Sequence, residues 1–138
     1  MQIRELNLKE LYTSYELVKQ LRVNLSYEEF EDLVYDMRHI EYKMFGIMDK
    51  EKLITYAGVS VVTNLYHKRH LFIYDLVTDE KKRANGYGKM MLEYLHDYAK
   101  TCMCENIVLS SGFTKENAHV FYEKNHLLKK SFVFVKEI

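Results

Sequence analysis

Three consecutive strand-like runs are the feature that most constrains the fold of this chain. "KMFGIMD" at 43–49 and "LITYAGVSVV" at 53–62 are rich in β-branched and aromatic residues, and the polar turn "DKEK" separates them. This pattern is typical of an antiparallel hairpin. A third run of the same kind, "HLFIYDLVT", follows at 70–78. The middle of the chain is therefore expected to form a sheet, which the rest of the chain has to cover.

The segment before these runs has the spacing of two helices. Apolar residues recur at three- and four-residue steps from Leu8 to Leu25, which predicts one helix with a buried face. "SYEE" at 26–29 has the form of a capping box and marks the start of the second helix. The residues expected to face inward are Leu8, Leu11, Tyr15, Val18, Leu21 and Leu25 in the first helix and Phe30, Leu33, Val34 and Met37 in the second.

The segment after these runs alternates between helical and strand patterns. Helical spacing returns after Gly88, "NIVLSS" at 106–111 reads as a short strand, "TKENAHVFYEKN" at 114–125 reads as a helix, and "SFVFVKEI" at 131–138 reads as a last strand. With a short strand around Ile3, the predicted order is βααβββαβαβ. The fold class is α/β (mixed α+β), with a mixed, mostly antiparallel sheet flanked by helices. No linker-like tract interrupts the chain, so residues 1–138 are expected to form a single domain.

Composition excludes several classes of function. Lys plus Arg equals Asp plus Glu at 20 each, so the overall charge gives no reason to expect nucleic-acid binding. No apolar run approaches the roughly 20 residues that cross a bilayer, and the charged N-terminus does not resemble a targeting segment. Two cysteines with C-x-C spacing are too few for a disulfide scaffold or a zinc site. We expect a cytoplasmic protein that binds neither a membrane nor a metal.

A glycine-containing loop lies between the run at 70–78 and the next helix. Two of the five glycines, Gly86 and Gly88, stand where this helix begins, and Lys81, Lys82 and Arg83 precede them. The first N–H groups of a helix have no partner within the helix, and glycine lets a ligand approach them closely. The loop is therefore a candidate site for an anion such as a pyrophosphate. The patterns of Walker-type phosphate loops and of dinucleotide folds are absent.

Two motifs resemble those of the GNAT superfamily of N-acetyltransferases. "RANGYG" at 83–88 resembles the acyl-CoA-binding motif Arg/Gln-x-x-Gly-x-Gly/Ala between a strand and a helix, and "NAHVFYEKNHL" at 117–127 resembles a second motif on the last core helix. Two departures stand out. Ala84 takes a place where many relatives have glycine, a mild change if its φ is negative. His126 replaces the usual glycine, so either Asn125 or His126 is expected to adopt a left-handed conformation.

The resemblance implies acetyl transfer from acetyl-CoA, as cosubstrate, to a primary amine of an unidentified acceptor in a ternary complex. It implies that the backbone of Leu76, Val77 and Thr78 pairs with the pantetheine arm, with Thr78 N–H as a candidate donor to the thioester carbonyl. Asn117 would hydrogen-bond the same arm. The residues implied for the pyrophosphate are Arg83, Ala84, Asn85, Gly86, Tyr87, Gly88 and Lys89.

Two residues are candidates for the chemistry. The second motif implies that Tyr122 faces the departing sulfur. Because a phenol with a pKa near 10 would have to protonate a thiolate near 8.5, transfer runs uphill by roughly 2 kcal/mol, so Tyr122 is expected to stabilise the thiolate by a hydrogen bond. Asp75 is the acidic candidate for deprotonating the amine, directly, through water, or by attracting a cation. His119 is the weaker alternative base. For Tyr122, the alternative is that its ring serves only in packing, and for Asp75 the alternative is a structural role.

Two other functions remain open from the sequence. The chain could be a CoA-binding regulatory or interaction module without turnover, or a partner protein whose glycine loop only packs. The first alternative predicts affinity for CoA without its amine-dependent release, and the second predicts no affinity. A homodimer formed through the last strands is a further expectation that comes from the resemblance.

Overall fold

The computed structural model describes residues 1–138 as two compact units, residues 1–108 and 109–138. The first unit is built on a five-stranded sheet in the spatial order β1-β2-β3-β4-β5. The first four strands are antiparallel neighbours. Glu105 N–H, just before β5, donates to the carbonyl of Arg69 near the start of β4 at 2.7 Å, so these two strands run in the same direction. The strands are β1 (Gln2–Leu6), β2 (Lys43–Asp49), β3 (Lys52–Asn64), β4 (Lys68–Thr78) and β5 (Asn106–Leu109). The mixed, mostly antiparallel sheet predicted from the sequence is thus confirmed.

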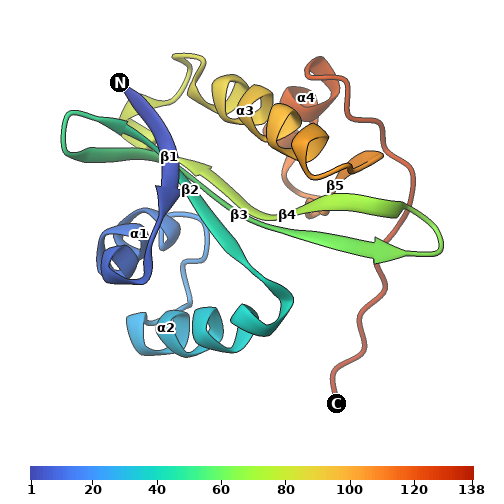
Figure 1. The fold of residues 1–138 in the computed structure, drawn as a ribbon, viewed down its shortest axis with the longest axis horizontal. Coiled ribbons are helices and arrows are strands. Elements are labelled where there is room, and N and C mark those ends of the chain that lie inside the picture. The colour runs from blue at the N-terminus through green and yellow to red at the C-terminus, as the bar shows by residue number, and fades with distance from the viewer. The chain divides into compact units, whose positions relative to one another are not determined.

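Helices cover both faces of the sheet in the first unit. Figure 1 shows α1 (Leu11–Val18) and α2 (Tyr27–Asp36) on one face and α3 (Tyr87–Thr101) on the other. The buried residues under α1 and α2 include Tyr56 and Val77 from the sheet. On the other face, the ring of Phe45 contacts Tyr94 and Tyr98 of α3 with centroid distances of 5.5 and 5.0 Å. Short 3-10 turns lie at η1 (Leu8–Glu10), η2 (Met37–Ile40) and η3 (Glu80–Lys82), and α4 (Glu116–Lys124) belongs to the second unit. None of these helices combines the length and the apolar character needed to cross a membrane.

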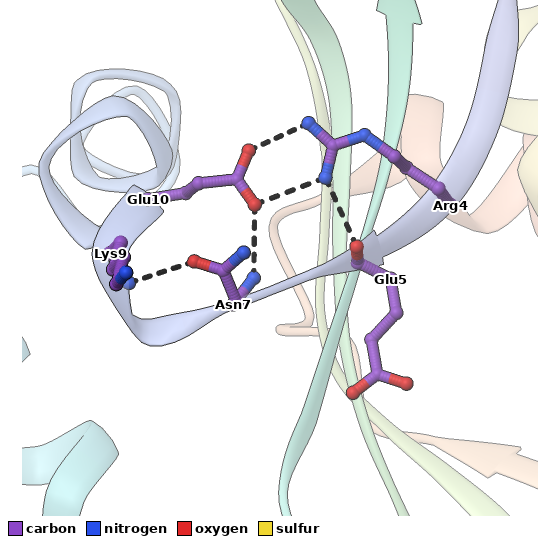
Figure 2. A network of polar contacts seen from close by, with 5 residues as sticks. All are labelled: Arg4, Glu5, Asn7, Lys9 and Glu10. Atoms are coloured by element: carbon purple, nitrogen blue, oxygen red, sulfur yellow. Dashed lines mark hydrogen bonds and ion pairs between the residues drawn. The ribbon is translucent and has the colours of Figure 1, made fainter.

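The first helix is shorter than the helix predicted over 8–25. It is preceded by η1, which Asn7 caps by accepting from Lys9 N–H at 2.9 Å. Glu10 Oε1 in turn accepts from Asn7 N–H at 3.0 Å, and Arg4 holds the Glu10 carboxylate through both its oxygens (Figure 2). After Val18 the backbone tightens into turns, with Gln20 N–H bonded to the carbonyl of Leu17 at 3.1 Å. Residues 19–26, called the connector below, therefore leave the helix axis.

The second helix starts where the capping box predicted. Ser26 Oγ accepts from Glu29 N–H and Ser26 N–H donates to Glu29 Oε1, both at 3.1 Å. Phe30 and Val34 are buried, as expected. Leu33 is 49% exposed, so its predicted inward orientation is wrong. At 100° per residue it lies beyond the edge of the buried stripe that Phe30 and Val34 define.

The last predicted strand is not formed. Residues 127–138 carry no helix or strand, so the element order ends with α4 instead of the predicted final β. Alternation in 131–138 places Phe132 and Phe134 on one face and Val133 and Val135 on the other, so a strand here would need a neighbouring strand and apolar cover on both sides. Phe134 is 93% exposed. The fold class is confirmed, whereas this one element is a correction.

Candidate functional site

The end of β4 presents backbone groups to the side away from β3. Asp79 N–H donates to the carbonyl of Ile54 at 2.8 Å, and Thr78 lies opposite Thr55 in the register. Residue pairs across an antiparallel ladder alternate between hydrogen-bonded and non-hydrogen-bonded. Because Asp79 and Ile54 form a hydrogen-bonded pair, Thr78 and Thr55 form a non-hydrogen-bonded pair, and Val77 and Tyr56 form the next hydrogen-bonded pair. Leu76 and Thr78 consequently direct their backbone groups away from β3.

The neighbouring strand on that side is too short to pair with all of β4. β5 has 4 residues where β4 has 11, and it begins beside the start of β4. The carbonyl of Thr78 is bonded by Arg83 Nε at 3.2 Å. Val77 has its side chain in the core, 5% exposed, and its backbone committed to β3. Of the three residues predicted to pair with pantetheine, Leu76 and Thr78 are the two whose backbone faces outward.

The predicted phosphate loop begins with a tight turn held by Asp79. Its side-chain Oδ1 accepts from Lys81 N–H at 3.2 Å, and its carbonyl accepts from Lys82 N–H at 2.8 Å. The bond from Lys81 lowers the pKa of Asp79, an effect that burial partly opposes. Asn85 Nδ2 then donates to the carbonyls of Lys82 and Arg83 at 2.9 and 3.1 Å. The loop is thus closed by hydrogen bonds among its own residues.

The start of α3 has the features that a bound anion needs. Gly86 is the N-cap, with φ 84° and ψ 8°, and no side chain caps the first turn. A Cβ placed on Gly86 would meet no atom within 4 Å outside its chain neighbours and its own helix, so space lies open beside this N-cap residue. Lys81, Arg83 and Lys89, all exposed, lie in the loop and in the first turn of α3. This donor set fits the pyrophosphate of a CoA molecule.

Ala84 does not meet the condition on which its substitution was expected to be mild. Its φ is +64°, in the left-handed region, whereas a mild change required a negative φ. The turn from Arg83 to Gly86 therefore contains two left-handed residues, Ala84 and Gly86, and only one of them is glycine. An alanine in this region carries strain of roughly 1–2 kcal/mol.

Asp75 lies at the centre of a polar cluster on the α1 side of the sheet. Arg22 Nε and Nη2 both lie 3.0 Å from its Oδ1, and Tyr42 donates its hydroxyl to Oδ2 at 2.9 Å. The hydroxyl of Tyr42 is also 2.8 Å from that of the fully buried Tyr56. Burial raises the pKa of both tyrosines, so they remain neutral donors at physiological pH. The Asp75 carboxylate therefore has a partner on each oxygen.

A β-bulge adjoins this cluster. Asp75 lies opposite Gly58 whereas Ile73 lies opposite Val59, so Tyr74 is an extra residue in β4. Arg22 Nη2 donates to the carbonyl of Tyr74 at 2.8 Å, which satisfies a group that the bulge disturbs. One guanidinium therefore binds the bulged residue and the carboxylate that follows it.

The connector also reaches the chain just after β4, through Gln20. Its Oε1 accepts from Glu80 N–H at 2.9 Å, and its Nε2 is 3.4 Å from Asp79 Oδ1. Gln20 and Arg22 thus bind the chain on either side of Leu76–Thr78. Sequence reasoning missed both residues, and Tyr42 as well. The one signal available was Gly58 within a strand pattern, since an isolated glycine there marks a bulge or a close approach.

The second unit carries the other predicted site residues, all on or beside α4. Asn117 is exposed in its first turn, and Tyr122 is partly buried with its ring 5.5 Å from that of Phe121. His119 Nε2 lies 2.8 Å from the carbonyl of Gly112, so one ring nitrogen is engaged within this unit. After α4, His126 has φ 71° and Asn125 has φ −99°, so His126 is the residue that adopts the left-handed conformation.

His, Cys, Asp and Glu side chains are the groups that could gather in this fold as metal ligands or as a reactive thiol site. No three His, Cys, Asp or Glu side chains gather as metal ligands would. Cys102 and Cys104 are both free thiols. Burial raises the pKa of Cys104, which lowers its thiolate fraction at neutral pH.

The chain is similar to known proteins in both sequence and fold. The chain is 30% identical to the uncharacterized N-acetyltransferase YhdJ of Bacillus subtilis (strain 168), over 99% of this chain and 98% of that protein. Its fold matches glucosamine-6-phosphate N-acetyltransferase from Arabidopsis thaliana, with a TM-score of 0.77, 24% identity and coverage of 99% and 97%. It also matches an aminoglycoside N-acetyltransferase in complex with CoA, with a TM-score of 0.85, 14% identity and coverage of 99% and 93%. A model of the acetyltransferase (GNAT) family matches residues 6–126. The chain therefore belongs to the GNAT family of acetyltransferases.

Proposed function

We propose that this protein transfers an acetyl group from acetyl-CoA to a primary amine in a ternary complex. The observation that carries the proposal is the uncapped start of α3 at Gly86, which is joined to the outward-facing backbone of Leu76 and Thr78 by the loop of residues 79–85. A phosphate group and an extended chain attached to it would thus find adjacent partners. The names of the relatives, and the CoA in one related structure, support the choice of cosubstrate.

The residues of the first unit would hold the cosubstrate through its two polar parts. The pyrophosphate would bind the N–H groups at the start of α3 and the loop from Arg83 to Lys89. Leu76 and Thr78 would pair with the pantetheine arm as though it were an added strand, and Val77 would support them through its bonds to β3. Asn117 of α4 is the further residue we assign to this arm.

Acetyl-CoA supplies an activated thioester, and the protein has to stabilise charge on its oxygen and sulfur. Thr78 N–H is the candidate donor for the oxygen, because a donor fixed in a strand needs no rearrangement as charge develops. Tyr122 is the candidate donor for the sulfur. Asp75, His119 or water accepts the proton of the amine. For Asp75, the bonds from Arg22 and Tyr42 favour attracting a cation over accepting the proton directly or through water.

The proposal is tested by calorimetric titration with acetyl-CoA and with S-acetylpantetheine, which has the arm but lacks the pyrophosphate. We expect binding of acetyl-CoA that weakens at least tenfold for S-acetylpantetheine. A screen of primary amines for release of free CoA then tests turnover. Binding without amine-dependent release would favour a regulatory CoA-binding module, and no binding would leave the glycine loop a packing element.

Assembly and location are separate expectations. The exposed side chains of Phe132, Val133, Phe134 and Val135 would lose contact with water if residues 131–138 paired with those of a second copy. We therefore expect a homodimer, which light scattering of the purified protein would detect. The single-domain organisation and the cytoplasmic location also remain predictions.

A further inference from the structure

The two oxygens of Asp75 are bound by neighbours of different kinds. Oδ2 accepts from Tyr42, whose hydroxyl lies between the fully buried Tyr56 and Gly58. Oδ1 is held by Arg22, whose side chain is 47% exposed whereas that of Asp75 is 16% exposed. The inner partner is thus fixed by packing. The outer partner comes from the connector, is half exposed, and is held besides Asp75 only by the carbonyl of Tyr74, at 2.8 Å from Nη2.

From this asymmetry we infer that the guanidinium of Arg22 lies at Oδ1 of Asp75 in the place where the ammonium group of the acceptor binds. An acceptor amine would then bind by displacing the Arg22 side chain. The inference rests on the proposed function and adds the substrate class. A guanidinium and a primary ammonium are both cations with several N–H donors, so either can complete the carboxylate. Oδ1 already accepts from Nε and contacts Nη2 of Arg22, which together occupy its two lone pairs, so an ammonium group can bind there only when the guanidinium leaves.

The geometry of the pair differs from that of an ion pair built to stay closed. Arg4 binds Glu10 in a fork, with one nitrogen 3.0 Å from Oε1 and the other 2.7 Å from Oε2 (Figure 2). Arg22 instead directs Nε and Nη2 to the single oxygen Oδ1, each at 3.0 Å, and shares Nη2 with the carbonyl of Tyr74, so Oδ2 is left to Tyr42. Tyr42 retains Oδ2 when Arg22 leaves, so Asp75 keeps its position during the exchange.

The exchange selects among acceptors by their charge. A largely buried carboxylate is costly to leave without a cationic partner, so a neutral molecule would not displace Arg22. Alkyl amines with a pKa near 10.4 are ammonium ions at neutral pH and can compete. Aromatic amines, which are neutral at this pH, cannot. Arg22 is therefore the residue that makes this site select cationic acceptors over neutral ones.

The test uses n-butylammonium chloride as the probe and n-butanol as its uncharged control of similar length. Binding to the complete protein is followed by the backbone amide resonances of Asp75 and Tyr42 in NMR titrations. We expect Arg22→Ala to bind n-butylammonium at least fivefold more tightly than wild type, and Arg22→Lys to stay near wild type because it keeps a competing cation. The double variant Arg22→Ala/Asp75→Asn should lose this gain, and n-butanol should not distinguish the variants.

Equal or weaker binding of n-butylammonium in Arg22→Ala would overturn the inference, as would a matching gain for n-butanol, which would indicate only an enlarged cavity. Should Arg22→Ala fail to fold, Arg22→Met keeps the aliphatic stem and carries the same expectation. Acetyl-CoA calorimetry on the same samples separates the two proposals. Loss of acetyl-CoA binding with retained cation exchange would reject the proposed function alone.

Discussion

The hydroxyl of Tyr42 lies directly against Gly58, at the place where a side chain on any other residue would begin. This contact brings the tyrosine from the start of β2 across β3 to reach Asp75 on β4. Glycine is needed here for close approach, since its neighbour across the sheet is the carboxylate that Tyr42 binds.

Gly58→Ala should therefore lower the free energy of unfolding by about 1–3 kcal/mol, because the added methyl group displaces the Tyr42 hydroxyl from its site. Urea denaturation measures this change. Gly112→Ala is the matched control, because a Cβ there would meet only Lys115 Cγ at 3.7 Å. Its effect should stay within about 0.5 kcal/mol. Similar values for the two variants would contradict the contact.

Ala84→Gly should stabilise the protein. Glycine adopts the left-handed conformation of residue 84 without strain, and this gain exceeds the added freedom of the unfolded chain, leaving a net increase of about 0.5–1 kcal/mol. Thermal unfolding is the measurement. Ala118→Gly, within α4, is the control and should lose roughly 1 kcal/mol. Lower stability of Ala84→Gly would show that the turn does not strain the alanine.

Gly86→Val should weaken acetyl-CoA binding more than tenfold, because the branched side chain fills the open space in front of α3. The left-handed φ of 84° adds a stability cost, which a comparison with Gly86→Asn isolates, since asparagine tolerates this conformation better. Calorimetry and thermal unfolding are measured on both variants. Wild-type affinity in a folded Gly86→Val would argue against this loop as the pyrophosphate site.

Tyr122→Phe should lower turnover roughly 10²-fold and leave the affinity for acetyl-CoA nearly unchanged, because it removes only the hydroxyl proposed to stabilise the leaving thiolate. Steady-state release of CoA gives the rate, and calorimetry gives the affinity. Phe121→Leu is the control for packing beside the same ring. An unchanged rate in Tyr122→Phe would remove this residue from the chemistry.

The contribution of the Arg4–Glu10 pair to stability should depend on pH. The bonds from Arg4 hold the pKa of Glu10 below its ordinary value, although burial opposes them. The stabilisation is therefore complete above the unfolded pKa of about 4.3 and is lost as the pH falls through the lower folded pKa.

Arg4→Met should accordingly be less stable than wild type at pH 7, and the difference should shrink as the solution is acidified below about pH 4.3. Urea midpoints at pH 3 to 7 measure it. Lys19→Met removes an exposed ion pair with Glu16 and serves as the control. A constant difference between Arg4→Met and wild type at all pH values would assign the effect to packing instead of charge.

Local patterns predicted most of the elements because they depend on neighbours in sequence. The capping box at Ser26 and the helix start after the glycine loop follow from a few adjacent residues. The cluster around Asp75 was not predictable in this way. Arg22 lies 53 residues and Tyr42 lies 33 residues from Asp75 in sequence, and nothing in their own surroundings indicates the contact.

The missing strand at 131–138 and the left-handed φ of Ala84 have a common physical origin. The sequence pattern reports local preference, whereas both outcomes depend on the surroundings. A strand forms only where another strand offers its edge. The φ of residue 84 is set by the turn that Asp79 and Asn85 close through their side chains.

The outward-facing backbone of Leu76 and Thr78 has a consequence for how such proteins diverge. Peptide groups offer the same donors and acceptors whichever side chain the residue carries, so mutation can replace either residue and leave this edge intact. Sequence comparison consequently records little of it, while the neighbouring turn leaves a trace because its shape demands glycine. A fold shared at only 14% or 24% identity is compatible with the same edge, because the edge does not depend on which side chains the strand carries.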